Sequence, residues 1–468
     1  MSEQAGAAAE VYAAGEAQEG YGLRAGVLGP LETLAQSVSA MAPSTSPSLT
    51  IPLVFAIAGN ATWLVYLLAM CATLVVGFCV SRFARLSASP GSLYTYTADT
   101  LPRVFGVAAG WGLLLAYLAT GASVAGGALY YTSLLGQQFL HFSPPAVLAL
   151  VVVCAAAGYV AYRDVKLSAE LMLWIEVCSL SLIFIVLAVM LVRNGLHLDM
   201  EQFRLRGVRF SALGPALVLS MFSFVGFESA TTLGGEARNP LRTIPRAVIQ
   251  CAIIAGIFFV LCSYSEVLGF RGESGKLSET TSPLHILAAK AGVSPLGVGI
   301  DFGAFISMIA CVLACVTAAS RVLMRMAHEK LISPVFGRTS AAHGTPVAAI
   351  AFSTGAIFVG TLVMTMRGVS GADVYDLAGS LSVFGFLTAY ALVAIALPFA
   401  RRARNQRSGL VMMISAVAVV VVILIAVADL RSTADVAHAR LPYVYLVYIG
   451  AGFAWYATRR RQMVASRA

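Results

Sequence analysis

Charged side chains are scarce in this chain. Asp, Glu, Lys and Arg make up 11% of its 468 residues, and 59% of the residues are hydrophobic. A soluble protein carries about 25% charged residues, so the composition argues against a soluble globular domain. Apolar runs of about 20 residues, the length that crosses a bilayer as a helix, recur along nearly the whole sequence. These features predict an all-α polytopic membrane protein.

The motifs of catalysis, metal binding and ATP-driven transport are also missing. Neither a Walker-type phosphate loop nor a nucleophile elbow occurs, and His285, His328 and His343 have no metal-ligand spacing. The eight cysteines fall within apolar runs, where they are expected to be small packing residues. The net charge of +9 is spread between the apolar runs and forms no basic patch for nucleic acid. We therefore expect no enzyme activity, no cofactor, no metal and no nucleic-acid partner.

Apolar runs predict twelve membrane spans. They cover residues 28–50, 58–82, 105–136, 144–162, 167–192, 211–234, 246–270, 298–324, 346–366, 376–400, 409–428 and 441–459. With the N-terminus in the cytoplasm, about two thirds of the 31 Lys and Arg residues lie on the cytoplasmic side, as the positive-inside rule requires. One loop opposes this bias, since Arg204, Arg206 and Arg209 would lie outside. The pattern predicts a protein of the cell membrane with both termini in the cytoplasm.

Two of these spans are interrupted in ways that lipid penalises. The first contains Pro43 and Pro47 among hydroxyl side chains, and the sixth contains Gly226 and Glu228. They stand five spans apart, so they occupy equivalent places in two five-helix halves. Paired broken helices of this kind are typical of transporters that have an inverted repeat and a substrate site near the middle of the membrane. A tolerated kink is the alternative for either span alone.

This symmetry predicts a domain organisation. The first 27 residues form a disordered cytoplasmic tail, 28–192 the first five-helix repeat, and 211–400 the second, inverted one. Residues 409–459 supply two accessory helices, which either pack a homo-oligomer or complete the bundle, and 460–468 form a second cytoplasmic tail.

Four motifs resemble the amino acid–polyamine–organocation superfamily of permeases. They are Phe224 to Pro245, with its GFE start and Asn-Pro; Ser89 to Tyr96 with Gly110-Trp111; Ala318 to Leu323 running on to Gly344-Thr345-Pro346; and Gly385-Phe386 with Tyr390 and the basic run 401–407. The resemblance covers about residues 25–460. It implies the five-plus-five inverted-repeat fold with two additional C-terminal helices, and alternating-access transport of amino acids or related amines.

The sequence departs from this family pattern at three places. Ala42 to Ser46 stand where many relatives have a Gly-Ser-Gly turn, and His328-Glu329-Lys330 stand where relatives often have Arg-Asp-Gly. Glu176 falls where some proton-coupled relatives have a lysine. The first departure leaves open how a substrate carboxylate is held.

Broken helices expose backbone groups that suit a zwitterion. Free N–H groups at half-helix N-termini favour an anion, and free C=O groups at half-helix C-termini favour a cation. We predict a substrate site in which the first break takes the carboxylate and the carbonyls of the second take the ammonium, with one of its phenylalanines closing over the ligand. The predicted residues are Ala42, Ser44, Thr45 and Ser46 in the first break, and Phe222, Ser223, Phe224, Gly226 and Phe227 in the second. Ordinary core packing is the alternative for the aromatic residues.

Three carboxylates are candidates for coupling or gating. Glu228 either pairs with a cationic substrate or satisfies N–H groups of the broken helix. Glu236, close in sequence to Arg238 and Arg242, is predicted to form a gate or an interfacial ion pair. Glu176 lies in a strongly apolar run and either carries a proton or makes a structural hydrogen bond.

Sodium coupling is less favoured than proton coupling. The resemblance implies that a sodium site would use neighbouring hydroxyls on the eighth helix, as in sodium-coupled proteins that share this fold, whereas Thr317 and Ser320 stand three residues apart. The leading prediction is a secondary active transporter that imports an amino acid. A polyamine or small-amine permease is the alternative within transport, and a membrane receptor that binds amino acids without moving them is the alternative of another class.

Overall fold

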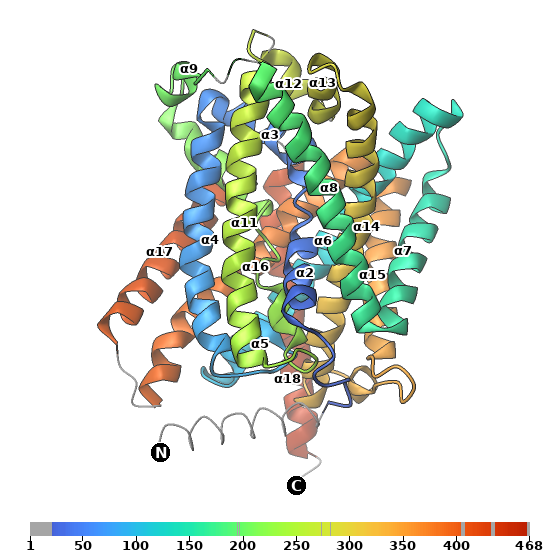
Figure 1. Cartoon of the computed structure of the whole chain (residues 1–468). Helices are drawn as coiled ribbons and strands as arrows, with labels where there is room; N and C mark the ends of the chain where they lie inside the picture. The colour runs from blue at the N-terminus through green and yellow to red at the C-terminus, as the bar shows by residue number, and fades with distance from the viewer. Residues whose placement is uncertain are drawn as a thin grey trace.

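A computed structural model describes residues 21–193, 195, 197–272, 274–280, 282–403, 408–431 and 436–465. Most of the predicted N-terminal tail and the last three residues lie outside these ranges. The described residues form a bundle of long helices with one isolated β-bridge, Leu28 to Ala237 (Figure 1). The described chain ends lie at the lower end of the bundle in Figure 1, and α9 (Met200–Phe203) lies at the upper end.

The helices follow the twelve predicted spans in order. The first five spans are α2 (Pro30–Met41) with α3 (Ile51–Ala58), α4 (Thr62–Ala84), α6 (Arg103–Leu140), α7 (Ala146–Arg163) and α8 (Val165–Arg193). The next five are α10 (Leu213–Phe222) with a 3-10 turn at Ser229–Leu233, α11 (Pro240–Gly269), α14 (Ser294–His328), α15 (Val347–Met366) and α16 (Gly371–Ala403). The last two are α17 (Gly409–Arg431) and α18 (Val436–Ala465).

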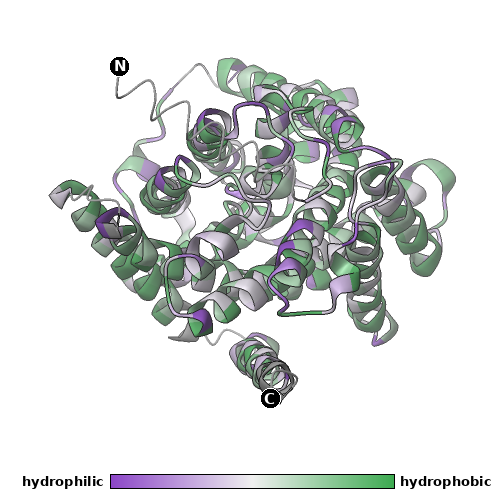
Figure 2. Ribbon diagram, turned by 90° about the horizontal axis from the view of Figure 1, so that it is seen from below, coloured by the Kyte–Doolittle hydropathy of each residue, from purple (hydrophilic) through white to green (hydrophobic). Residues whose placement is uncertain are grey.

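Nine helical stretches in the described residues are long and apolar enough to cross a membrane. The first, Pro30–Ala84, contains the first two predicted spans, and the sixth span is represented by the shorter apolar stretch Phe210–Phe222. Nine stretches thus correspond to twelve predicted spans: the first two spans count as one stretch, the sixth is too short to count, and α18 is long but more polar. Figure 2 shows hydrophobic residues predominating in the helices around the periphery, as expected of surfaces that face lipid.

Short helices between the second and third spans of each half lie at opposite ends of the bundle. In the first half this helix is α5 (Ser92–Ala98), at the lower end (Figure 1). In the second half α12 (Ser274–Glu279) and α13 (Pro283–Lys290) lie at the upper end. An inverted repeat requires this relation, because equivalent segments of its two halves face opposite sides of the membrane.

Glycines let two central helices cross closely. A Cβ on Gly385 of α16 would lie 2.3 Å from the carbonyl oxygen of Gly112 on α6. Small residues at such crossings are the usual means of packing helices in membranes. The close crossing brings Tyr117 of α6 and Tyr390 of α16 to the same level of the bundle, where both reach the break of the sixth span.

Candidate functional site

The first span is broken between α2 and α3. Helix α2 ends at Met41, and Ala42 takes a left-handed conformation with φ of 45°. Pro43 lacks an N–H group and lies in the gap after α2, and the chain becomes helical again in a π-helical turn, Ser46–Thr50, that has Pro47 in its first turn and leads into α3. The hydroxyls of Ser44 and Thr45 are buried and have no hydrogen-bond partner in the structure. The break therefore holds polar groups whose bonding capacity is unused.

The sixth span is broken at the same level. Helix α10 ends at Phe222, and turns lead to the 3-10 segment that begins at Ser229. Gly226 has φ of 92°, a conformation that side chains with a Cβ rarely adopt, and a Cβ there would lie 2.8 Å from the carbonyl oxygen of Ala40. The glycine thus lets the two broken backbones touch.

The carbonyls of the sixth-span break are only weakly occupied. The N–H of Val225 donates to Phe222 O at 3.4 Å, and that of Phe227 donates to Phe224 O at 3.3 Å. Both distances lie beyond the usual range for N–H···O bonds, and each carbonyl keeps a second lone pair. These oxygens remain able to accept a hydrogen bond from an ammonium group.

The three phenylalanines of this break have different surroundings. Phe222 meets Tyr375 edge to face at 5.4 Å and borders a cavity of about 260 Å³ between α3, α10, α16 and α18. Phe224 packs against Phe259 at 5.2 Å, and Phe227 lies 5.5 Å from Tyr390, both fully inside the protein. Phe222 is thus the aromatic residue placed beside open space.

Glu228 joins the sixth-span break to two helices. Its carboxylate accepts hydrogen bonds from the hydroxyl of Tyr117 at 2.9 Å and from that of Tyr390 at 2.7 Å. Each oxygen has its own donor, and the side chain is completely buried. The arrangement connects the sixth-span break to α6 and α16 through tyrosine hydroxyls, which are neither of the partners expected from the sequence.

Glu236 forms a buried ion pair with a residue that is distant in sequence. Arg321 of α14 donates from Nε at 2.7 Å and from Nη2 at 2.6 Å, and both side chains are at most 1% exposed. The sequence placed Glu236 beside Arg238 and Arg242, but the guanidinium of Arg238 donates to Gly26 O instead. A bidentate pair of this kind is both strong and geometrically specific.

Glu176 of α8 has one partner and one free oxygen. Ser307 of α14 donates to Oε1 at 2.6 Å, whereas Oε2 is buried without a hydrogen-bond partner. One turn along α14, the thiol of Cys311 donates to Ala40 O at 3.3 Å. Residues four apart lie on the same face of a helix, so α14 links the Glu176 carboxyl to the carbonyl that contacts Gly226.

Residues 21–28, which we call the N-terminal strap, cover the lower end. Arg24 pairs with Asp164 at 2.7 Å, and Tyr21 accepts a hydrogen bond from Arg325. Leu28 donates its N–H to Glu236 O at 3.1 Å, so the strap reaches the buried ion pair. The lower end is closed over the broken helices.

A second polar cluster surrounds Arg325 beside the strap. Arg325 pairs with Glu329 at 2.8 Å and lies 3.6 Å from Asp99, which follows α5. Burial raises the pKa of the Asp99 carboxyl, and the guanidinium of Arg325 opposes that shift. Tyr94 of α5 donates to Glu329. These contacts fasten the loop between the second and third spans to the end of the eighth.

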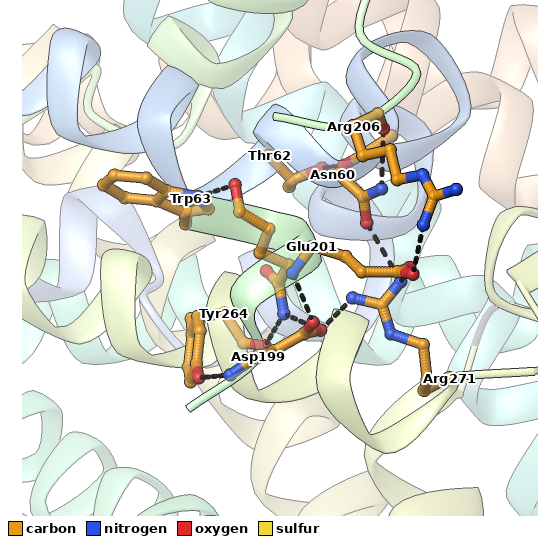
Figure 3. A network of polar contacts seen from close by, with 10 residues as sticks. Asn60, Thr62, Trp63, Asp199, Glu201, Arg206, Tyr264 and Arg271 are labelled. Atoms are coloured by element: carbon orange, nitrogen blue, oxygen red, sulfur yellow. Dashed lines mark hydrogen bonds and ion pairs between the residues drawn. The ribbon is translucent and has the colours of Figure 1, made fainter. Parts of the chain in front are cut away.

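The upper end carries the network drawn in Figure 3. Arg271, just beyond α11, pairs with Asp199 and, at 3.0 Å, with Glu201, and donates to Asn60 Oδ1 at 3.2 Å. Arg206 also pairs with Glu201, at 3.3 Å. The network ties the linker between the fifth and sixth spans to α4 and α11. It also gives an acidic partner to Arg206, which belongs to the basic loop that opposes the positive-inside bias.

Sequence reasoning missed the groups that contact the predicted site from other helices. Gln36 of α2 donates to Ser229 Oγ at 2.8 Å and to Ala314 O at 3.0 Å. Tyr117, Ser307 and Gln36 have no local signal, because each acts through a neighbour far away in sequence. Glu266 of α11 is different: it is a carboxyl within an apolar run, and the criterion that selected Glu176 would have found it.

Comparison with solved structures shows the fold. A manganese transporter from Eremococcus coleocola matches with a TM-score of 0.59 over 92% of this chain and 93% of its own, at 13% identity. Together with the paired broken helices, this match defines an inverted-repeat membrane fold. The family model described as amino acid permease matches residues 48–464, and the chain belongs to that family.

Two curated relatives illustrate the range of similar proteins. The branched-chain amino acid permease of Bacillus subtilis is 25% identical over 363 residues, which cover 74% of each chain. Human cationic amino acid transporter 4 is 24% identical over 72% of this chain and 54% of its own length. The family membership bears out the resemblance seen in the sequence motifs.

Proposed function

We propose that the protein imports an amino acid by alternating access, with the substrate held between the two broken spans and with proton coupling. One observation carries the proposal: the sixth-span break meets the end of α2 where Gly226 approaches Ala40 O, and both breaks keep polar groups whose bonding capacity is unused. The hydroxyls of Ser44 and Thr45, with the N–H groups at the start of the next helical turn, suit a carboxylate. The carbonyls of Phe222 and Phe224 suit an ammonium.

Membership of the amino acid permease family supports this class of substrate. The two relatives named above are described as carriers of branched-chain and of cationic amino acids, so the family accommodates different side chains. We infer that the backbone groups of the breaks recognise what amino acids share, and that the surrounding residues select the side chain. The lower end, with the strap and the basic loops, faces the cytoplasm in this proposal.

Coupling to protons is assigned to Glu176. Its free Oε2 lies in an apolar surrounding, and an uncompensated charge there costs several kcal/mol. Protonation removes that cost, and Ser307 and Cys311 connect the group to the first break. A metal cation beside Thr317 is disfavoured, because Arg321 already donates to Thr317 O at 3.0 Å.

The first test is substrate counterflow in liposomes with a panel of amino acids and polyamines. We expect accumulation of an amino acid by the wild type and at least a tenfold loss for Gly226→Leu, because a side chain there strains the backbone and separates the breaks. Gly355→Leu is the matched control, since Gly355 on α15 has open space around it. Saturable binding without accumulation would point to a receptor, and preference for polyamines would point to the other permease class.

The second test concerns the proton. Uptake by Glu176→Gln is expected to lose its dependence on external pH while substrate binding persists. An unchanged pH dependence in this variant would remove Glu176 from the coupling mechanism.

A further inference from the structure

Glu266 on α11 is the most isolated carboxyl that the structure describes. Its side chain is completely buried, and neither Oε1 nor Oε2 has a hydrogen-bond partner. Glu228 and Glu236, by contrast, have a donor on each oxygen, and Glu176 has one on Oε1. The proposed import mechanism does not use Glu266.

The position of Glu266 places it on the upper side of the broken sixth span. Helix α11 ends near it, at Gly269, where the Arg271 network begins. Tyr66 of α4 faces Glu266, and the Tyr66 hydroxyl lies 3.3 Å from Ser223 Oγ in the break. The same tyrosine ring packs against Phe259 at 5.8 Å. Tyr66 therefore stands between the carboxyl and the candidate substrate site.

No described cation is placed to neutralise this carboxyl. The titratable groups that face it are Tyr66 from α4 and Cys262, one turn earlier on α11. Arg271 is engaged by Asp199 and Glu201, and Lys290 of α13 lies over the Phe270 ring and donates to Gly269 O.

The carboxyl of α8 is also remote from this position. Glu176 lies near Cys251 of α11, and Cys251 is about four helical turns from Glu266 along that helix.

A charged carboxylate cannot persist in such a place without a bound cation. Its burial costs several kcal/mol when no hydrogen bond or opposite charge compensates it. A proton removes the charge and needs a single oxygen, whereas a metal ion requires several ligands, and the described residues contain no group of three or more His, Cys, Asp and Glu side chains that could hold one. The buried ionisable groups of membrane transporters are commonly proton carriers for this reason.

We propose that Glu266 is a second proton-binding site, reached from the upper side of the membrane and separated from the candidate substrate site by the Tyr66–Ser223 contact. The carboxylate takes up one proton from water when the upper end opens and returns it to water in the same way. The proton is the only species transferred, and no other bond changes. The site itself is defined by geometry and does not depend on the proposed import. Only its part in a transport cycle rests on that proposal.

Infrared difference spectroscopy of the full-length protein in liposomes tests this site without requiring transport. The wild type is titrated with acid, and the carbonyl stretch of protonated carboxyls is followed, with ¹³C-labelled glutamate to separate Glu from Asp. We expect Glu266→Gln to lose one glutamate band that Glu176→Gln keeps. Tyr66→Phe keeps Glu266 and is expected to shift the titration midpoint of that band, which makes the test independent of whether Glu266→Gln folds.

Two outcomes would overturn the proposal. One is a Glu266→Gln spectrum that matches the wild type at every pH, together with an unshifted Tyr66→Phe titration. The other is a Glu266 band that responds to sodium or potassium at fixed pH, which would assign a metal cation to the site. Failure of the import proposal would instead appear as missing counterflow with the Glu266 band intact.

Discussion

Glu228 looks functional in the sequence, but its hydrogen bonds in the structure lead us to infer a structural role, that of a clamp between helices. A carboxylate in the middle of a broken span suggests a substrate contact, but both of its oxygens are taken by tyrosine hydroxyls from α6 and α16. Hydrogen bonds to a charged group contribute about 1.5–3 kcal/mol each. The carboxylate therefore stabilises the packing that brings the two breaks together.

Replacing this carboxylate tests its role as a clamp. Glu228→Gln keeps the shape but leaves one tyrosine hydroxyl without an acceptor, so we expect a loss of about 1–3 kcal/mol in stability. Thermal unfolding in detergent measures it, with Tyr159→Phe as the control because Tyr159 is 61% exposed. Unfolding of Glu228→Gln at the wild-type temperature would contradict the clamp.

The pair of Glu236 and Arg321 makes a second prediction for single residues. Removing one partner of a buried ion pair leaves an uncompensated charge and costs about 3–5 kcal/mol. We expect Glu236→Gln and Arg321→Met each to lose stability on this scale, and the double variant to lose clearly less than the sum. A double-mutant cycle from denaturation measures the coupling. Strict additivity would show that the two side chains do not act as a pair.

These residues also show where sequence reasoning stops. The scarcity of charge and the interrupted apolar runs indicate that Glu176, Glu228 and Glu236 are unusual, because each is a carboxyl in or beside a span. Their partners Ser307, Tyr390 and Arg321 lie on helices that are far away in sequence, and no local pattern encodes such contacts. The role of Glu236 was therefore foreseeable as an ion pair, but the identity of its cation was not.

At the scale of helices, the apolar runs locate the spans but not their ends. The run 246–270 predicts a span that begins after the basic loop, whereas α11 begins at Pro240. Proline is favourable at the first helical position, because its fixed φ suits the helix and no N–H is needed there. The helix therefore starts at the proline, before the apolar residues. Short helices such as α9 and α13 have no periodicity of their own and depend on tertiary contacts.

The close crossing of α6 and α16 predicts a large effect of a small change. A side chain at Gly385 would collide with Gly112 O, which is backbone and cannot turn aside. We expect Gly385→Val to separate the helices, to lower stability by at least about 1–3 kcal/mol, and to impair transport. Gly450→Val on α18 is the control, because nothing lies within 4 Å of a Cβ there. Equal unfolding temperatures for the two variants would exclude a tight crossing.

At the scale of the whole molecule, the two ends are closed by different kinds of contact. The lower end has the buried Glu236–Arg321 pair beneath the N-terminal strap, and the upper end has the partly exposed network of Arg271 (Figure 3). Exposed ion pairs contribute about 0–1 kcal/mol each and weaken with salt, whereas buried pairs are screened much less. Opening the upper end should therefore require less free energy than opening the lower end.

Hydrogen exchange on the protein in lipid nanodiscs tests this asymmetry. We expect Arg271→Gln to raise amide exchange in residues 199–206 and to leave the strap unchanged, and Glu236→Gln to raise exchange in the strap alone. Raising the salt concentration is expected to imitate Arg271→Gln in the wild type, because the upper pairs are accessible to ions. Arg367→Gln is the control, since Arg367 is exposed and lies outside both clusters. Exchange that rises at both ends in either variant would mean that the two closures are not separate, and alternating access through them would then lose its structural basis.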